Sequence, residues 1–216
     1  MNYIQNLILD NHDLTNEKLE NILSAACPKN IDFADLYFQY TNSEGWQLED
    51  GIVKSGSSNI DSGVGIRSVA GDKSGFAYSN NFNYENLISA AKTSKCIVKS
   101  GQSREIQLGN SQNIRKLYNS VSPLDFKTDD IKVKFLKDID KYVRDKDDRV
   151  EQVIVSLAGT YDSILILNTD GIKAFDDRPL VRFSVMVILK VGDRRERGSS
   201  GGGGRYSYDE IIDTKF

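Results

Sequence analysis

The sequence predicts an α+β protein built from antiparallel strands and packed helices. Apolar residues recur at helical spacing in three stretches, and in the other stretches they alternate with a period of two, which is typical of strands. Asp-Gly pairs, which favour tight hairpin turns, stand between alternating stretches at 50–51 and 170–171. Because such turns join antiparallel neighbours, a wound parallel sheet is not expected.

The first part of the chain, about 15–80, is expected to be a helix followed by a small β-meander. Thr15 can cap the helix, and Pro28 follows its end. The residues after it are rich in aromatic and β-branched side chains, which favour strands. These strands are expected to break at Gly45 and to turn at Asp50-Gly51 and Gly71-Asp72.

Two helices are expected between about 83 and 149. Asn83 can cap the first, whose apolar stripe consists of Tyr84, Leu87, Ile88, Ala91 and Val98. A polar loop over 101–123 follows. The apolar face of the second helix consists of Ile131, Phe135, Ile139, Tyr142 and Val143. We interpret the alternating charges of this helix as a solvated surface rather than a binding patch.

The period of two returns over about 150–192. Three strands are expected in 150–198, with a hairpin at Asp170-Gly171 and with Pro179 at the entrance to the third strand, where a missing N–H is least costly. The residues 198–204 form a glycine-rich edge of the predicted fold. The chain as a whole, 1–216, is therefore expected to be one α+β domain.

Four consecutive glycines, 201–204, raise the question of a phosphate-binding loop. Such a loop needs a lysine and a Ser or Thr after its last glycine, whereas Arg205 and Tyr206 follow here and no helix is predicted to begin there. Two explanations remain. The Gly-Ser composition favours a flexible connector, and the alternative is a backbone packed so closely that no Cβ fits.

Few residues are suited to metal or nucleophilic chemistry. His12 is the single histidine and is expected at the surface. Cys27 and Cys96 lie far apart, and both are expected to be buried in a reducing compartment. No catalytic and no metal-binding residue is assigned. A carboxylate-only site at Asp129-Asp130, Asp147-Asp148 or Asp176-Asp177 remains an alternative.

The composition argues against nucleic-acid and membrane partners. The 28 Lys+Arg and 31 Asp+Glu give a net charge of −3, without the basic excess of nucleic-acid-binding domains. The N-terminus has no basic region and only a short apolar run, unlike a signal peptide. No other apolar stretch approaches the length that crosses a bilayer. The protein is expected to be cytoplasmic.

The arginines beside the glycines are the candidate site residues. Arg195, Arg197 and Arg205 can contact an anionic ligand, a substrate strand or a protein interface. Asp193 and Glu196 dilute their charge, so that an internal ion pair or a contact at an interface is favoured over nucleic-acid binding.

Long stretches of the chain resemble the TldD-like members of the TldD/PmbA metallopeptidase family. The first is TDGIKAFDDRPLVRFSVMV, followed by RRERGSSGGGGRY, and the second is DFADLYFQYTNSEGWQLEDGIVKSGSSNIDSGVGIRSVAGDKSGFAYS. The likeness extends through YNSVSPL and covers nearly all of the chain from the first helix onward. The stretches are long and unusual in composition, so the match is highly specific.

The resemblance implies a cytoplasmic bacterial protease subunit that cleaves unfolded peptides together with a TldE/PmbA-type partner subunit. It implies the N-terminal α+β half of such a protein. In the family the C-terminal half carries an HExxxH motif, whose two histidines bind zinc and whose glutamate activates water.

This sequence contains no HExxxH motif, so no family metal ligand or catalytic glutamate is transferred to it. We expect a chain truncated before the catalytic half, with no zinc of its own and inactive alone. The alternative is a non-catalytic module that binds peptides or a partner. A third hypothesis is that a separate chain supplies the catalytic half.

Overall fold

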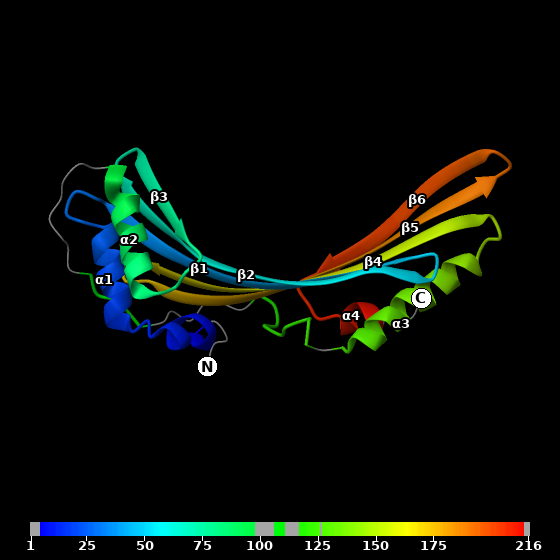
Figure 1. The fold of residues 1–216 in the computed structure, drawn as a ribbon, viewed down its shortest axis with the longest axis horizontal. Helices are drawn as coiled ribbons and strands as arrows, with labels where there is room; N and C mark the ends of the chain where they lie inside the picture. The colour runs from blue at the N-terminus through cyan, green and yellow to red at the C-terminus, as the bar shows by residue number, and fades with distance from the viewer. Residues whose placement is uncertain (1–4, 98–105, 111–116, 126, 214–216) are drawn as a thin grey trace. The chain divides into compact units, whose positions relative to one another are not determined.

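The computed structural model describes residues 5–97, 106–110, 117–125 and 127–213, which form helices and one six-stranded sheet (Figure 1). The strand order is β3-β2-β1-β4-β5-β6, with β2 antiparallel to β3 and β5 antiparallel to β6, so the α+β prediction is confirmed. The strands are β1 (Phe33–Glu49), β2 (Ile52–Ala70), β3 (Lys73–Ser79), β4 (Val150–Asn168), β5 (Lys173–Val191) and β6 (Arg194–Gly204).

Two of the helices begin at capping side chains that the sequence offers. The Lys18 amide donates a hydrogen bond of 3.3 Å to the Thr15 hydroxyl, and the Asn86 amide donates one of 2.9 Å to the Asn83 side chain. Both predicted caps are confirmed. The helices are α1 (Asn16–Ala26), α2 (Tyr84–Ser94), α3 (Asp129–Arg144) and α4 (Asp209–Ile212), with short turns η1 (Gln5–Leu9), η2 (Asp10–His12) and η3 (Lys95–Ile97).

The chain forms two compact units, each built from three separate segments. Unit 1 comprises Met1–Tyr40, Asp61–Arg115 and Ser163–Asp176, and unit 2 comprises Thr41–Ile60, Lys116–Asp162 and Asp177–Phe216. The strands β1, β2, β4 and β5 therefore each contribute residues to both units. Whether the chain is one domain, as the sequence predicts, stays a prediction.

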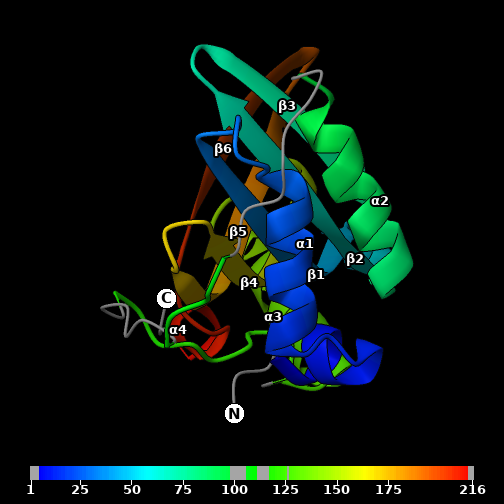
Figure 2. The same ribbon diagram turned by 90° about the vertical axis from the view of Figure 1, so that its left-hand side faces the viewer.

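In unit 1, α1 and α2 lie side by side against β1, β2 and β3 (Figures 1 and 2). Their apolar stripes supply the core, in which Leu23 of α1 and Leu87 of α2 are fully buried together with Phe38 of β1. In unit 2, α3 packs its Phe135 and Leu136 onto a second core with Val155 of β4.

The tight turns follow the local sequence. Asp50 and Gly51 both have positive φ, 51° and 74°, as a type I′ hairpin requires. Gly71 has a φ of 54° between β2 and β3, and Gly171 a φ of 81° between β4 and β5. The predicted turns are confirmed at all three places.

Two predicted strand breaks are wrong. Gly45 lies inside β1, and the strand continues through it. A Cβ added at Gly45 would make only an ordinary contact of 3.4 Å with Ser57 Oγ. Pro179 lies inside β5 rather than at the start of a strand. Pairing of β5 with β6 begins only at Val181, so the missing N–H of Pro179 interrupts no bond to β6.

The helical predictions need three corrections. The helix predicted after Asn83 ends at Ser94, and Val98 lies outside the described residues. Cys96, predicted to be buried, is exposed in the turn that follows, whereas Cys27 is buried as predicted. In α3 the Ile131 and Tyr142 side chains are 41% and 43% exposed, so the buried face is narrower than predicted. The predicted loop 101–123 lies partly outside the described residues.

Candidate functional site

The glycine tract forms the second half of β6, and among the described residues β5 is the only strand that neighbours it (Figure 1). The two strands pair antiparallel from Val181 opposite Gly204 to Val191 opposite Arg194. The flexible-connector hypothesis is therefore wrong. The composition suggested a connector because glycine is rare inside strands, where it has no side chain to pack against neighbouring residues.

Close approach of the two backbones explains two of the glycines. A Cβ at Gly201 would lie 2.4 Å from the Phe183 carbonyl oxygen, and one at Gly203 would lie 2.1 Å from the Val181 carbonyl oxygen. Nothing lies within 4 Å of a Cβ added at Gly198 or Gly202. The close-packing alternative is confirmed at 201 and 203, which lie one pleat apart on the same side of β6.

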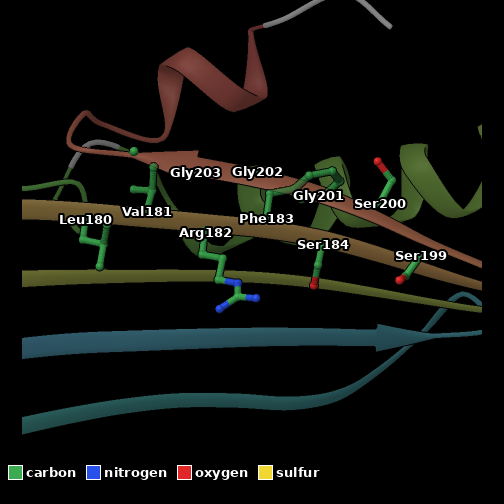
Figure 3. Close-up of a pocket in the computed structure, with 11 residues that line it drawn as sticks. Leu180, Val181, Arg182, Phe183, Ser184, Ser199, Ser200, Gly201, Gly202 and Gly203 are labelled. Atoms are coloured by element: carbon green, nitrogen blue, oxygen red, sulfur yellow. The ribbon is translucent and has the colours of Figure 1, made fainter.

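A groove of about 550 Å³ accompanies this glycine row and is lined by residues 180–184 of β5 and 199–204 of β6 (Figure 3). Val181 and Phe183 belong to the core of unit 2, together with residues of α3. Because side chains alternate along a strand, Arg182 and Ser184 point to the opposite side, as Figure 3 shows.

The three arginines that the sequence singled out do not converge. Arg195 lies on β6 opposite Lys190, and it donates two hydrogen bonds to Glu151, at 2.6 and 2.8 Å. Arg197 lies on β6 opposite Ile188. Arg205 follows the end of β6, about 27 Å along an extended strand from Arg197, at about 3.3–3.4 Å per residue.

Arg205 is held by its neighbours at the end of the strand. Its guanidinium donates a hydrogen bond of 3.3 Å to the Pro179 carbonyl and lies 5.7 Å from the centre of the Tyr118 ring. The structure thus places Arg195 in an ion pair and Arg205 in a packing contact. The assignment of these residues and of Arg197 to a substrate strand or interface remains a hypothesis.

The ion pair of Arg195 perturbs its acidic partner. Hydrogen bonds from Arg195 lower the pKa of Glu151 to about 2, and Lys190 contributes through its nitrogen at 3.4 Å from the same carboxylate. The same contact raises the pKa of Arg195. Glu151 therefore stays ionised, and it joins β4 to β5 and β6 through side chains.

A buried cation in unit 2 is the feature that sequence reasoning missed. Lys132 of α3 is 1% exposed, and its ammonium lies 2.6 and 2.9 Å from the two carboxylate oxygens of Glu44. The ammonium also lies near two aromatic rings, 5.9 Å from the centre of Trp46 and 5.5 Å from that of Tyr208. Not all charges of this helix are solvated, so that prediction is wrong at Lys132 and at Asp140, which is also buried. The sequence signal for this buried cation was a charged residue, Lys132, at a helical position on the apolar face of α3.

Tyr208 closes this cluster from the segment that follows β6. Its side chain is fully buried, and a Cβ at Gly159 of β4 would lie only 2.3 Å from its hydroxyl oxygen. Burial and the Glu44 carboxylate raise the pKa of the Tyr208 phenol, so it stays neutral. Gly159 therefore makes the space for Tyr208, and the cluster fixes the chain as it leaves the glycine strand.

The residues present do not fit a zinc centre. His12 is exposed and packs edge-on against Phe82, with ring centres 5.4 Å apart. In the part of the chain that the structure describes, no three His, Cys, Asp or Glu side chains are grouped as metal ligands. No step of a reaction is therefore derived through a metal on these residues.

The acidic pairs have individual surroundings. Asp129 and Asp130 are exposed in the first turn of α3. Asp147 accepts hydrogen bonds from Arg149, which lower its pKa to about 2. Asp176 and Asp177 are half-buried in β5. The exposure of Asp129 and Asp130 agrees with the solvated surface predicted for α3.

Family models of two consecutive domains match this chain. The PmbA/TldA metallopeptidase domain 1 matches residues 34–95, and the PmbA/TldA metallopeptidase central domain matches residues 122–215. The chain belongs to the PmbA/TldD metallopeptidase family. The first match covers most of β1 to α2, and the second covers α3, β4, β5 and β6.

Curated relatives carry the same family name. The chain is 41% identical over 218 residues to the metalloprotease TldD homolog of Haemophilus influenzae, covering 99% of this chain and 45% of that protein. It is 36% identical over 205 residues to the one of Buchnera aphidicola subsp. Schizaphis graminum, covering 95% and 42%. The chain spans a little under half the length of these relatives.

A solved PmbA/TldD structure has the same fold. The crystal structure of TldE from Thermococcus kodakarensis superposes with a TM-score of 0.70 at 16% identity, covering 90% of this chain and 45% of that one. This likeness confirms the fold. Among the described residues of the present chain, no helix has both the length and the apolar character needed to span a bilayer.

Proposed function

We propose that this chain is the peptide-holding part of a TldD-like metallopeptidase, which degrades unfolded peptides together with a TldE/PmbA-type partner subunit. Family membership and the metalloprotease names of the curated relatives support the reaction class. We also propose a cytoplasmic location, for which the two free cysteines are the available support.

The single observation that carries the proposal is the outer edge of β6. This strand has 11 residues and is the last in the strand order, with β5 as its one neighbour. An edge strand offers backbone N–H and C=O groups that can pair with an extended peptide. Its glycines reduce side-chain obstruction, and backbone pairing holds peptides of many sequences, as an enzyme for unfolded chains requires.

Hydrolysis is assigned to residues outside this sequence. One histidine and two cysteines in 216 residues are too few for a zinc site of the usual His and Cys type. We therefore propose that residues 1–216 bind peptides but do not cleave them, and that zinc belongs to the catalytic part of the whole protein.

The proposal is tested by binding of labelled hexapeptides, measured by fluorescence anisotropy. Two peptides of one sequence carry N-methyl groups at alternate residues, one at the odd and one at the even positions. If the peptide adds to β6 as a strand, only one set of N–H groups faces the protein, so one peptide loses binding and the other keeps it. Equal binding of both, or no binding of the unmodified peptide, overturns the proposal.

The partner is tested separately. The chain is mixed with a TldE-type subunit, and the mass of the mixture is measured by sedimentation velocity. A complex supports the role of a subunit, whereas two independent species contradict it.

A second candidate function is a non-catalytic peptide-binding module, which the same β6 edge favours. Because hydrolysis is assigned to a catalytic part outside residues 1–216, the two functions separate when the chain is combined with its partner, a separate catalytic half that carries the HExxxH motif, and an unfolded peptide. Chelator-sensitive cleavage that depends on the presence of this chain supports the subunit, and binding without any cleavage supports the module.

A further inference from the structure

The groove on β5 and β6 has an unbalanced charge. Its lining, residues 180–184 and 199–204, contains one arginine, Arg182, and no carboxylate. Two of its serines, Ser184 and Ser199, lie on the same side of the strands as Arg182 (Figure 3). Arg182 is exposed, and it points away from the core of unit 2 (Figure 3). A groove with one cation and hydroxyl donors on the same side is complementary to an anion.

The floor of the groove next to Arg182 is bare backbone. Gly203 is the register partner of Arg182, and Gly201 is the partner of Ser184. A side chain at either glycine would collide with the β5 backbone, as the distances of 2.1 and 2.4 Å require. Consequently, at Gly201 and Gly203, no side chain of β6 lies between Arg182 and the outer edge of β6.

The Arg182 guanidinium is available, in contrast to those of Arg195 and Arg205. Arg195 is engaged with Glu151, and Arg205 with the Pro179 carbonyl. In the described part of the chain, the Arg182 guanidinium makes no ion pair and no hydrogen bond. A guanidinium stays protonated at all physiological pH values and presents a planar fork that matches a carboxylate.

We propose that Arg182 binds a carboxylate of an extended peptide that lies along the glycine row of β6. The inference rests on the proposed function and adds a substrate class to it, namely peptides with an acidic side chain or a free C-terminus at this position. Leu180, on the same side of β5 and 42% exposed, supplies an apolar contact beside the carboxylate. A nucleic acid fits less well, because Phe183, the aromatic residue of the lining, packs on the core and offers no base-stacking surface.

The test uses the full chain and three labelled hexapeptides. The first has one central Glu with blocked ends, the second has Gln at that position with blocked ends, and the third is the Gln peptide with a free C-terminal carboxylate. At low salt we expect the Glu peptide to bind about tenfold more tightly than the blocked Gln peptide. A matching gain in affinity for the third peptide shows that the site also binds a C-terminal carboxylate.

The variant Arg182→Gln removes the guanidinium and is expected to abolish this gain, so that the Glu peptide and the blocked Gln peptide bind to the variant with equal affinity. The matched control is Lys54→Gln, which also removes one positive charge from an exposed strand position of unit 2 and is expected to keep the gain. Thermal unfolding of each variant establishes that it is folded.

The outcomes separate this inference from the proposed function. If the wild-type chain binds all three peptides equally, or if Arg182→Gln retains the gain, the role of Arg182 is refuted and peptide binding at β6 stands. If no peptide binds, both are refuted. Tighter binding of a hexanucleotide than of the Glu peptide, lost in Arg182→Gln, also refutes it, because the anion is then a phosphate.

Discussion

The ammonium of Lys132 lies 2.6 Å from a carboxylate oxygen of Glu44, inside the apolar core of unit 2. The two residues join α3 to β1 across 88 positions of sequence. Their side chains are 2% and 11% exposed, so both charges depend on each other for compensation. Removing one partner of a buried ion pair lowers the stability strongly, whereas replacing both partners by apolar residues changes it little.

Breaking this pair is expected to destabilise the chain strongly. Lys132→Met leaves the Glu44 carboxylate buried without its partner, and the free energy of unfolding should fall by about 3–5 kcal/mol in urea titrations. The double variant Lys132→Met/Glu44→Leu should recover most of the loss. As a control, Lys18→Met breaks an exposed ion pair with Asp13 and should cost no more than about 1 kcal/mol. Similar losses in the two single variants would contradict the burial argument.

The glycines of β6 are expected to differ in their tolerance of a methyl group. Gly203→Ala introduces a Cβ 2.1 Å from the Val181 carbonyl oxygen and should cost about 1–3 kcal/mol of unfolding free energy. Gly202→Ala meets open space and should be neutral or stabilising by up to about 1 kcal/mol, because it restricts the unfolded chain. Differential scanning calorimetry of the two variants gives the comparison, and equal losses would argue against close strand packing.

The contact between Gly159 and Tyr208 predicts an energetic coupling. Gly159→Ala places a Cβ 2.3 Å from the Tyr208 hydroxyl oxygen and should cost about 1–3 kcal/mol. Tyr208→Phe removes that oxygen and should relieve part of the strain, giving a coupling of at least about 0.5 kcal/mol in a double-mutant cycle. Strict additivity of the two changes in chemical denaturation would show that the residues do not touch.

The Glu151–Arg195 pair predicts a dependence of stability on pH. The pKa of Glu151 is about 2 in the folded chain, below its ordinary value of 4.5, so its contribution is complete above about pH 4.5 and is lost as the pH falls towards 2. Arg195→Gln should raise the Glu151 pKa towards its ordinary value, so that less stability is lost as the pH falls. The remaining ion pair with Lys190 should keep part of the pKa depression. The pKa is measured by NMR titration of the Glu151 carboxyl carbon, and an unchanged value in the variant would refute the pairing.

Sequence reasoning succeeded where the determining interactions are local. Thr15 and Asn83 cap helices through atoms three residues away, and Asp50-Gly51 forms a turn because two adjacent residues accept positive φ. It failed where a distant partner decides. Pro179 is tolerated inside β5 because β6 ends opposite Val181, and that register is not visible in the local pattern.

The candidate site was predicted in part. The sequence identified the glycine tract and its flanking arginines, but composition alone could not show that Gly201 and Gly203 face the β5 backbone. Arg182 was overlooked because it stands in an alternating strand, where an outward charge looks ordinary. Lys132 was overlooked because an alternating run of charges on α3 hides two members that are buried, Lys132 and Asp140.

The interleaving of the two units has a genetic consequence. Each unit takes residues from three segments, and the segments alternate along the chain, so no single cut in the gene separates one unit from the other. Recombination among homologues with one crossover between residues 41 and 176 would exchange pieces of both units at once. Accordingly the two units are inherited together, and their sequences must remain compatible in every viable hybrid.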